Sequence, residues 1–557
     1  MTNFNWAIDG SIVGVYLLAT MIAGVMMRRY VGKVEDFLVA GREMNVYLGI
    51  ASLAATEFGI VTAMYVAQAG YTRGFSGAIP GIAQAIVMLT VGMTGFCVKK
   101  LRDSNSMTLA QLFEDRFGLQ VRSLAGVVIV LGGLLNMGAF LRLGGEFLVI
   151  SCGFQFEHLV WMMTALLAMV AVYTMLGGML SVLVTDFLQF VVMSLGLLVV
   201  TILILKDVGW GNIVQGIQEH VGAGGFNPIA DPVQGTITIV YQLIFQLAVV
   251  LTWQTVIARF LAARDSQTGL KMYRGTSFFF VCRFVIPAIW GAAALYFLHT
   301  PEHAKDLQDL RRSEVARYQV SNQAHMPESV QQAIIVDAEG LAKTLKSKKD
   351  RTLEEQTTLD AANTVNDRVS RYAMPKFLGL FVPLGLMGLL IAAMLAADMS
   401  TDSSYMLTWS SVIYNDILAP FRRKRQWSER KGLFLNRTLV ALIGIFLFFF
   451  GLFYELPGSV LGYLWKTGEI YMTSMLVLLI ACCYWKRANN WGANTAICLG
   501  AAVPLFTLGM QIAAPDTIIG EFVTEQNDLM GILAFAAAAA GMIIGSLLKP
   551  NPIKEVI

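Results

Sequence analysis

The sequence carries little charge for its length. Of its 557 residues, 14% are charged and 56% are hydrophobic, and the formal net charge is +3. So few charges against so many apolar residues are typical of an integral membrane protein. A net charge this close to zero gives no indication of nucleic-acid binding, and we expect none.

The chain is also poor in residues that bind metals or form disulfides. Its six cysteines lie in or beside apolar segments without CxxC spacing, and its five histidines lie in loops or at helix ends. We therefore expect packing cysteines and no zinc site. No nucleophile–base pair or phosphate loop is visible, so we expect neither an enzyme nor a cofactor. Residues 1–9 lack Lys and Arg, which predicts no cleaved signal peptide.

Long apolar segments are the main feature of the sequence. Their number predicts an all-α polytopic membrane protein with about thirteen transmembrane helices. Two segments, 121–151 and 376–417, are too long for one straight crossing and should break or extend past the bilayer. The segments are 9–27, 45–70, 78–98, 121–151, 157–176, 180–205, 237–258, 275–298, 376–417, 435–454, 459–483, 491–513 and 529–547.

Lys and Arg concentrate in alternate loops, with Arg73 and Lys206 as exceptions. Arg259 is assigned to one of the basic loops, the one after the seventh segment. Because basic loops stay in the cytoplasm, thirteen crossings place the N-terminus outside and the C-terminus in the cytoplasm. We expect a multi-pass protein of the plasma (inner) membrane.

Residues 299–373 are the one long polar stretch, and they fall on the predicted outer side. Helix propensity predicts helices over 306–318, 329–346 and 353–372. A solvated insertion is the simpler interpretation, and an external lid or partner-docking element is the alternative. No obligate protein partner is indicated.

The segment 391–404 begins as an apolar helix and turns polar within the predicted membrane. Ala397, Ser400, Thr401 and Ser404 share one helix face, at i, i+3, i+4 and i+7. Neutral hydroxyl oxygens suit an alkali cation better than a transition metal. Alternatively, these hydroxyls bond to their own helix or pack against a neighbour.

Ionisable side chains also lie within the predicted spans. A carboxylate buried in lipid, such as Asp186, is costly unless a cation or a basic partner satisfies it. For Asp398, a water-filled vestibule is one interpretation. Arg142 and Glu146, at i and i+4, are expected to bridge each other. Alternatively, the Arg142 guanidinium grips a substrate carboxylate.

Four stretches, in matching order, resemble the sodium/solute symporter family. They are Gly-Gly-Met-Leu-Ser-Val-Leu-Val-Thr-Asp-Phe-Leu-Gln at 177–189, Gln-Thr-Val-Ile-Ala-Arg-Phe-Leu-Ala-Ala-Arg at 254–264, Ala-Ala-Asp-Met-Ser-Thr at 396–401 and Tyr-Trp-Lys-Arg-Ala-Asn-Asn-Trp-Gly-Ala at 484–493. The resemblance covers nearly the whole chain apart from the insertion.

The resemblance implies the leucine-transporter fold, in which two inverted five-helix repeats hold substrate and sodium where the first helix of each repeat is broken. The implied organisation is a first transmembrane helix and cytoplasmic loop, a first repeat, an external loop, a second repeat containing the insertion, and two C-terminal helices with a short tail. The corresponding residues are 1–44, 45–205, 206–236, 237–483 with 299–373, and 484–557.

Two sodium sites follow from the resemblance. The first has as ligands the carbonyl oxygens of Ile50, Leu53 and Ala397 and the hydroxyls of Ser400 and Thr401. A possible second site consists of Asp186 with hydroxyls of the ninth span, namely Ser400, Ser403 and Ser404. This chain departs from the family pattern there, because Asp402 comes one residue earlier than the aspartate of many members.

Substrate candidates lie beside the first sodium site. Glu57 follows Leu53 by about one turn, and Trp253 stands where sugar transporters carry an amide or an acid. This position thus offers fewer polar partners for sugar hydroxyls than a sugar transporter does, which argues against a sugar. A carboxylate near an aromatic ring suits an amine. With Arg142 holding a carboxylate, a zwitterion fits. The candidates are Ser52, Glu57, Arg142, Trp253 and Gln254.

We therefore expect a symporter that imports a small organic solute with sodium as the coupling ion, and we favour an amine-containing or zwitterionic solute. The alternatives are proton coupling through Glu57, Asp186 or Asp398, and a monocarboxylate or sugar as the solute. A transporter-like solute sensor is a further alternative. The nine residues after Leu548 predict no signalling domain of the kind such sensors usually carry.

Overall fold

The computed structural model describes residues 2–230, 235–322, 326–348, 351–422, 427–454, 459–514 and 517–550. Within these ranges the regular structure is helical, and an isolated backbone bridge joins Met44 to Ala263. Eleven helical runs in this part of the chain are long and apolar enough to cross a membrane. The all-α membrane fold is therefore confirmed. The count of thirteen crossings and the side on which each end lies stay predictions.

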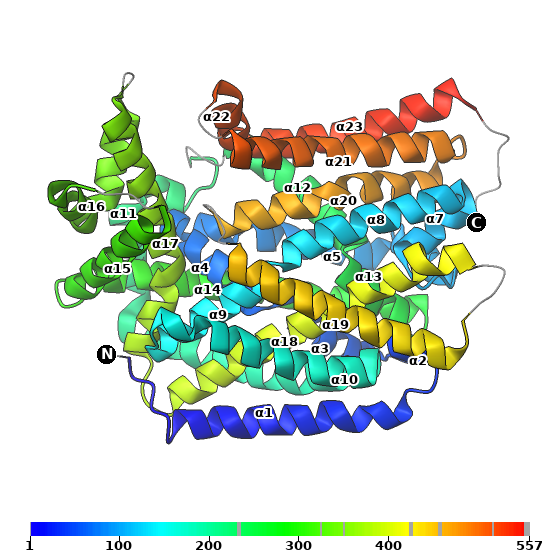
Figure 1. Ribbon diagram of the computed structural model, residues 1–557, viewed down its shortest axis with the longest axis horizontal. Coiled ribbons are helices and arrows are strands. Elements are labelled where there is room, and N and C mark those ends of the chain that lie inside the picture. Colours follow the sequence, from blue (N-terminus) through cyan, green and yellow to red (C-terminus); the bar gives the residue numbers. More distant parts are fainter. Residues whose placement is uncertain are drawn as a thin grey trace.

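The first half of the chain starts with α1, which lies along one edge of the molecule (Figure 1). Its helices are α1 (Asp9–Met26), α2 (Val34–Val39), α3 (Val46–Glu57), α4 (Ile60–Arg73), α5 (Ile79–Thr94), α6 (Val98–Asp103), α7 (Leu109–Phe117), α8 (Leu119–Met137), α9 (Phe140–Cys152), α10 (Leu159–Ile204) and α11 (Trp210–His220).

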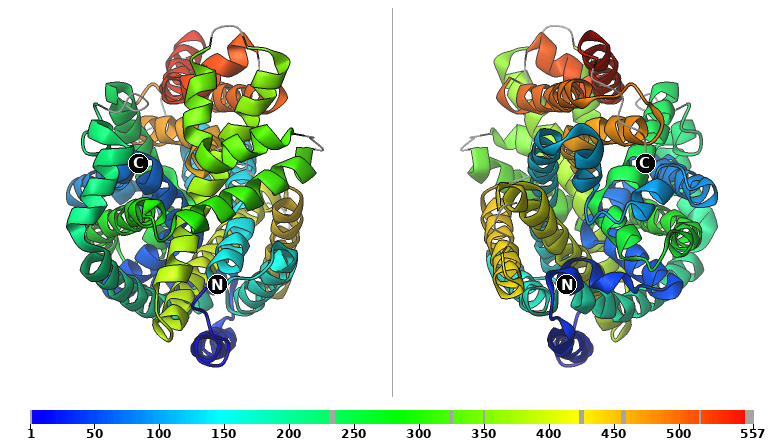
Figure 2. Two further views of the ribbon diagram at one scale, coloured as in Figure 1. Left: turned by 90° about the vertical axis from the view of Figure 1, so that its left-hand side faces the viewer. Right: turned by 90° about the vertical axis from the view of Figure 1, so that its right-hand side faces the viewer.

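The second half ends with α21 and α23, which lie side by side along the edge opposite α1 (Figures 1 and 2). Its helices are α12 (Gly235–Thr252), α13 (Gln254–Ala262), α14 (Ser266–His299), α15 (Ala304–Asn322), α16 (Glu328–Lys346), α17 (Leu353–Phe381), α18 (Leu386–Val412), α19 (Glu429–Phe453), α20 (Val460–Tyr484), α21 (Asn490–Ala513), α22 (Ile518–Glu525) and α23 (Asn527–Leu548).

The two overlong segments do break. The segment 121–151 divides into α8 and α9 at Gly138, and 376–417 divides between α17 and α18. Conversely, the segments 157–176 and 180–205 join into α10, which is interrupted at Gly178 (φ 51°, ψ −143°). A Cβ at Gly178 would lie 2.6 Å from the carbonyl oxygen of Phe37, so both the backbone conformation and the available space require glycine.

Two further interruptions lie at the centre of the molecule. Phe58 and Gly59 separate α3 from α4, and Trp253, with an extended ψ of 118°, separates α12 from α13. Each interruption leaves backbone carbonyl oxygens and N–H groups without helical partners, and these groups are then available to ligands. The broken helices expected from the resemblance are thus present, at the opening helix of each expected repeat. The boundaries of the repeats stay a prediction.

The insertion forms α15, α16 and the start of α17, as its helix propensity predicts, and lies at the same end of the molecule as the N-terminus (Figure 1). It is docked on the membrane helices. Gln68 of α4 donates hydrogen bonds to the carbonyl oxygen of Asp367 and to Ser370 Oγ, both at 3.1 Å. Burial raises the pKa of Glu314, which pairs with Arg317 at 3.1 Å. The insertion therefore packs as part of the structure and is only partly solvated.

Candidate functional site

A cavity lies next to the two central interruptions. Its lining comes from α3, α4, α5, α8, α9, α12, α14, α18 and α20, together with Trp253 at the second interruption. Its volume of about 70 Å³ exceeds several times the roughly 10–15 Å³ that one water molecule needs. The charged and aromatic lining residues are Glu57, Arg283, Tyr65, Phe140, Phe245, Trp253, Phe284, Tyr405 and Trp465, and the carboxamides are Gln84, Asn136 and Gln246.

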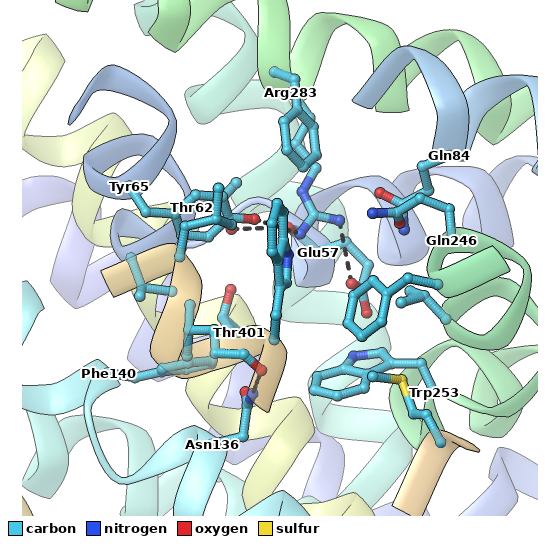
Figure 3. A pocket seen from close by; sticks show the side chains of 18 of the residues that line it. Glu57, Thr62, Tyr65, Gln84, Asn136, Phe140, Gln246, Trp253, Arg283 and Thr401 are labelled. Carbon is cyan, nitrogen blue, oxygen red and sulfur yellow. Dashed lines mark hydrogen bonds and ion pairs between the residues drawn. The ribbon is translucent and has the colours of Figure 1, made fainter. Parts of the chain in front are cut away.

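Glu57 is the acidic group of this cavity, as the sequence predicts for a substrate contact. It ends α3, is 3% exposed, and accepts a hydrogen bond of 2.5 Å from Thr255 Oγ1 of α13. Its other carboxylate oxygen lies 3.3 Å from Arg283 Nη1 (Figure 3). The carboxylate therefore connects the two broken helices and is balanced by one guanidinium.

Arg283 of α14 is the basic group of the cavity, and the sequence reading missed it. Its Nη2 donates to Tyr65 Oη at 3.4 Å, and its guanidinium lies 5.2 Å and 5.4 Å from the ring centroids of Phe280 and Phe284. Among the described residues its Nε has no hydrogen-bond partner. The available signal was an Arg in the middle of the apolar segment 275–298, which is a functional-site indication in itself.

Aromatic rings form the wall of the cavity near Trp253. The indole Nε1 donates to Tyr405 Oη at 3.0 Å, and the ring stacks on Tyr471 with centroids 6.0 Å apart. Phe140 packs against Tyr405 at 5.2 Å. Trp253 thus lies in the cavity as predicted, fixed by the non-helical backbone at its own position.

Three predicted substrate contacts lie elsewhere. Arg142 is outside the cavity lining and bridges Glu146 at 3.0 Å, which is the i,i+4 ion pair that the sequence favours over a carboxylate grip. Gln254 faces a second, smaller cavity and donates to the carbonyl oxygen of Thr252. Ser52 is fully buried and donates to Asp186 Oδ2 at 2.5 Å.

The hydroxyl of Thr401 lies between two helix backbones. It donates to the carbonyl oxygen of Thr56 at 2.8 Å and to that of Ala397 at 3.0 Å. The end of α3 therefore meets α18 at Thr56, one turn after Leu53, whereas Ile50 lies two turns before the end of α3 with its side chain against Gly275. The negative end of the α3 dipole and its last carbonyl oxygens point to a place suited to a cation.

Asp186 of α10 lies in a fully buried cluster that includes Ser400, the neighbour of Thr401 in α18. Ser400 Oγ donates to Asp186 Oδ1 at 2.5 Å, and Arg259 Nη2 lies 3.2 Å from Asp186 Oδ2. Arg259 is 0% exposed, so its assignment to a cytoplasmic loop is corrected. The reason is the interruption at Trp253, after which α13 continues inward and carries Arg259 into the core.

The remaining predicted side chains of α18 differ in their partners. Ser403 Oγ donates to the carbonyl oxygen of Ser400 in its own helix, whereas Ser404 Oγ accepts from Arg259. Asp398 is 2% exposed, and a Cβ on Gly144 of α9 would lie 2.8 Å from its Oδ2. It packs against α9 and does not face the cavity, so the vestibule interpretation is corrected.

The chain is similar to known proteins over most of its length. The model of the sodium:solute symporter family matches residues 37–331 and 354–500. Sodium/glucose cotransporter 4 of Homo sapiens is 23% identical over 546 residues, which cover 92% of this chain and 71% of that protein. The high-affinity proline transporter PutP of Bacillus subtilis (strain 168) is 23% identical over 549 residues, which cover 96% of this chain and 97% of that protein.

A solved structure has the same fold. It is the substrate-bound outward-open state of a Na⁺-coupled sialic acid symporter, with a TM-score of 0.73, 18% sequence identity and 99% coverage of both chains. This likeness supports the leucine-transporter architecture expected from the sequence.

Proposed function

Since the chain belongs to the sodium:solute symporter family, we propose that it imports a small zwitterionic solute together with sodium. The chain is a multi-pass membrane protein, and the members that it resembles are cotransporters, not enzymes. The observation that carries the choice of solute is the pairing of Glu57 and Arg283 in one cavity.

The charges of the cavity favour a zwitterion over a simple ion. Glu57 and Arg283 balance each other, so a solute with one amine and one carboxylate keeps the cavity neutral when it inserts between them. The Arg283 guanidinium suits a carboxylate, and the amine gains both the Glu57 carboxylate and the face of Trp253. A solute of one charge would leave the group of like charge buried beside it, which is costly.

A second candidate is a hydroxylated solute that carries a carboxylate. Gln84, Asn136 and Gln246 line the same cavity and are hydrogen-bonding groups of the kind that hydroxyls need. A neutral hexose would use these amides and would need neither charge of the Glu57–Arg283 pair. We therefore rank a hexose below both zwitterion and hydroxy acid.

For the coupling ion we propose a site at the contact of α3 with α18. Its ligands are the hydroxyls of Ser400 and Thr401 and the carbonyl oxygen of Ala397, as predicted from the resemblance. From α3 we propose the carbonyl oxygens of Leu53 and Thr56 in place of Ile50 and Leu53, because Thr56 is the residue that Thr401 contacts. Hydroxyl and carbonyl oxygens are the ligands that hard cations prefer.

Replacing Thr401 by Ala should raise the sodium concentration for half-maximal uptake roughly tenfold, which corresponds to about 1.4 kcal/mol of lost binding. Uptake measured against sodium at fixed solute tests this prediction. An unchanged sodium dependence in a variant that folds would contradict the site. A proton gradient driving uptake without sodium would favour the proton-coupled alternative.

A second variant perturbs the same hydroxyl without removing it. A Cβ at Gly59 would lie 2.7 Å from Thr401 Oγ1, so Gly59→Ala should displace the hydroxyl and also weaken sodium dependence. Gly14→Ala is the matched control, because a Cβ there meets nothing within 4 Å. If both variants behave alike, the close approach at Gly59 has no part in sodium binding.

The function as a whole is tested by a ligand screen on the purified protein. A ligand that binds only the folded protein stabilises it by RT ln(1 + [L]/Kd), so at one ligand concentration the tighter ligand gives the larger rise in melting temperature. We expect an amino acid such as proline to stabilise the protein more in sodium than in potassium. Choline, a short monocarboxylate, a hydroxy acid and a hexose are compared under the same conditions. Stabilisation by the hexose alone would overturn the proposed solute class, and sodium-independent stabilisation would overturn the coupling. Binding without uptake into proteoliposomes would instead favour a solute sensor.

A further inference from the structure

We propose that Arg259 takes the place of a second coupling sodium, so that the protein couples one sodium to each solute. This inference rests on the proposed sodium symport. It starts from the cluster around Asp186, where the resemblance implies a possible second cation site. The guanidinium of Arg259 already lies there, with Nη2 at 3.2 Å from Asp186 Oδ2.

The hydroxyls of the cluster are bonded to the guanidinium or to the carboxylate. Arg259 donates from Nε to Ser52 Oγ at 3.1 Å, and from Nη2 to Thr56 Oγ1 at 2.6 Å and to Ser404 Oγ. Asp186 accepts from Ser52 and from Ser400, each at 2.5 Å. The oxygens of Asp186, Ser52, Thr56 and Ser404 are thus already engaged by N–H and O–H donors of the protein, whereas Ser400 only donates and keeps its oxygen lone pairs for the proposed sodium site.

Because the cluster is buried, the Arg259 guanidinium excludes a sodium ion from Asp186. Asp186 and Arg259 are both 0% exposed, and their charges cancel. A sodium ion bound to Asp186 would lie within a few ångströms of the guanidinium, and two cations at such a distance repel strongly in a poorly solvated site. Arg259 therefore provides the positive charge that Asp186 requires, and it leaves Asp186 without a place for a mobile cation.

The positions of the partners explain why this arginine reaches the site. Asp186 belongs to α10 and Ser404 to α18, whereas Ser52 and Thr56 are in α3 and Arg259 is in α13. The cluster thus joins one half of each broken helix, α3 and α13, to the two neighbouring helices α10 and α18. Within the described residues, the partners of Arg259 in this cluster are Ser, Thr and Asp side chains, and no Cys or His side chain is among them.

The experiment counts sodium in the wild-type protein and in Arg259→Gln. In proteoliposomes, the ratio of ²²Na⁺ flux to solute flux should be one for the wild type. For Arg259→Gln the ratio should rise towards two, because Asp186 then lacks its cation and the surrounding hydroxyls are released. The double variant Arg259→Gln/Asp186→Asn should return to one.

Two results would overturn the inference. One is a wild-type ratio of two, and the other is a folded Arg259→Gln variant that still couples one sodium. If the variant does not fold, equilibrium binding of ²²Na⁺ to the wild type decides, with one sodium per protein supporting the inference and two refuting it. Solute uptake that needs no sodium would be the failure of the proposed symport itself, and is distinguishable from both results.

Discussion

Arg283→Gln should raise the solute concentration for half-maximal binding by a factor of about 30 or more, since losing one partner of a buried charge pair costs roughly 2–5 kcal/mol. The guanidinium lies in the cavity, with its Nε unpartnered among the described residues and its Nη1 3.3 Å from Glu57. A solute carboxylate would engage this fork, and glutamine offers neither its charge nor its geometry. The measurement is solute binding by thermal shift and by uptake, in saturating sodium.

The same measurement on Glu57→Gln tests the other charge of the pair. For a zwitterion it should weaken binding to a similar degree, because the amine then loses its counter-charge. For a monocarboxylate or hydroxy acid it should weaken binding little, because Glu57 makes no favourable contact with an anion. The two variants together therefore read out which charges the solute carries.

Arg142→Gln is the matched control. Arg142 also pairs with a buried glutamate in the membrane region, at 3.0 Å, but it lies outside the cavity lining. We expect it to change the melting temperature while leaving the solute dependence nearly unchanged. Weakened solute binding in Arg142→Gln together with normal binding in Arg283→Gln would favour the alternative in which Arg142 holds the solute carboxylate, and would contradict the role proposed for Arg283.

Several features of the candidate site could be predicted from the sequence because they depend on residues close together in the chain. The hydroxyl spacing in 391–404 correctly brings Ala397 and Thr401 together, since a helix fixes which residues share a face. The polar insertion and its helices were also predictable from composition and propensity. Glu57 was identifiable because a carboxylate within an apolar segment stands out.

The place of Arg259 and the choice of carbonyl oxygens in α3 depend on interruptions of the helices, which hydrophobic periodicity does not locate. Arg259 reads as a loop residue if the seventh span is one straight helix that ends near 258. With the interruption at Trp253, the chain starts a new helix, and the same arginine lies in the core. The choice of Thr56 over Ile50 has the same origin, because the end of α3 at Glu57 sets which carbonyl oxygens are left without helical partners.

Arg283 illustrates a different limit. Arg142 and Arg283 are both arginines in apolar segments, and their own segments do not say which one faces a cavity. The i,i+4 glutamate beside Arg142 is a local partner, and the structure confirms that pair. Arg283 finds its acidic partner 226 positions away in Glu57, and such a contact follows only from the packing of α14 against α3 and α4.

The second large effect concerns folding. Asp186→Asn should lower the free energy of unfolding by roughly 3–5 kcal/mol, because it leaves the guanidinium of Arg259 buried without a counter-charge. The change is small in volume, so packing stays nearly constant and the loss reports on charge. The measurement is thermal unfolding of the purified protein in detergent without sodium or solute, which keeps ligand binding out of the comparison.

The double variant Asp186→Asn/Arg259→Gln separates this loss from a general sensitivity of the core. With both charges removed, the uncompensated guanidinium is gone, and carboxamides can still bond the hydroxyls of Ser52 and Thr56. We therefore expect the double variant to be more stable than Asp186→Asn alone, with a strong coupling between the two positions in the mutant cycle. Simple addition of the two single losses would mean that the charges act independently. In that case the contact at 3.2 Å would not be what holds Arg259 in the core, and its place as the fixed cation of this cluster would have no energetic basis.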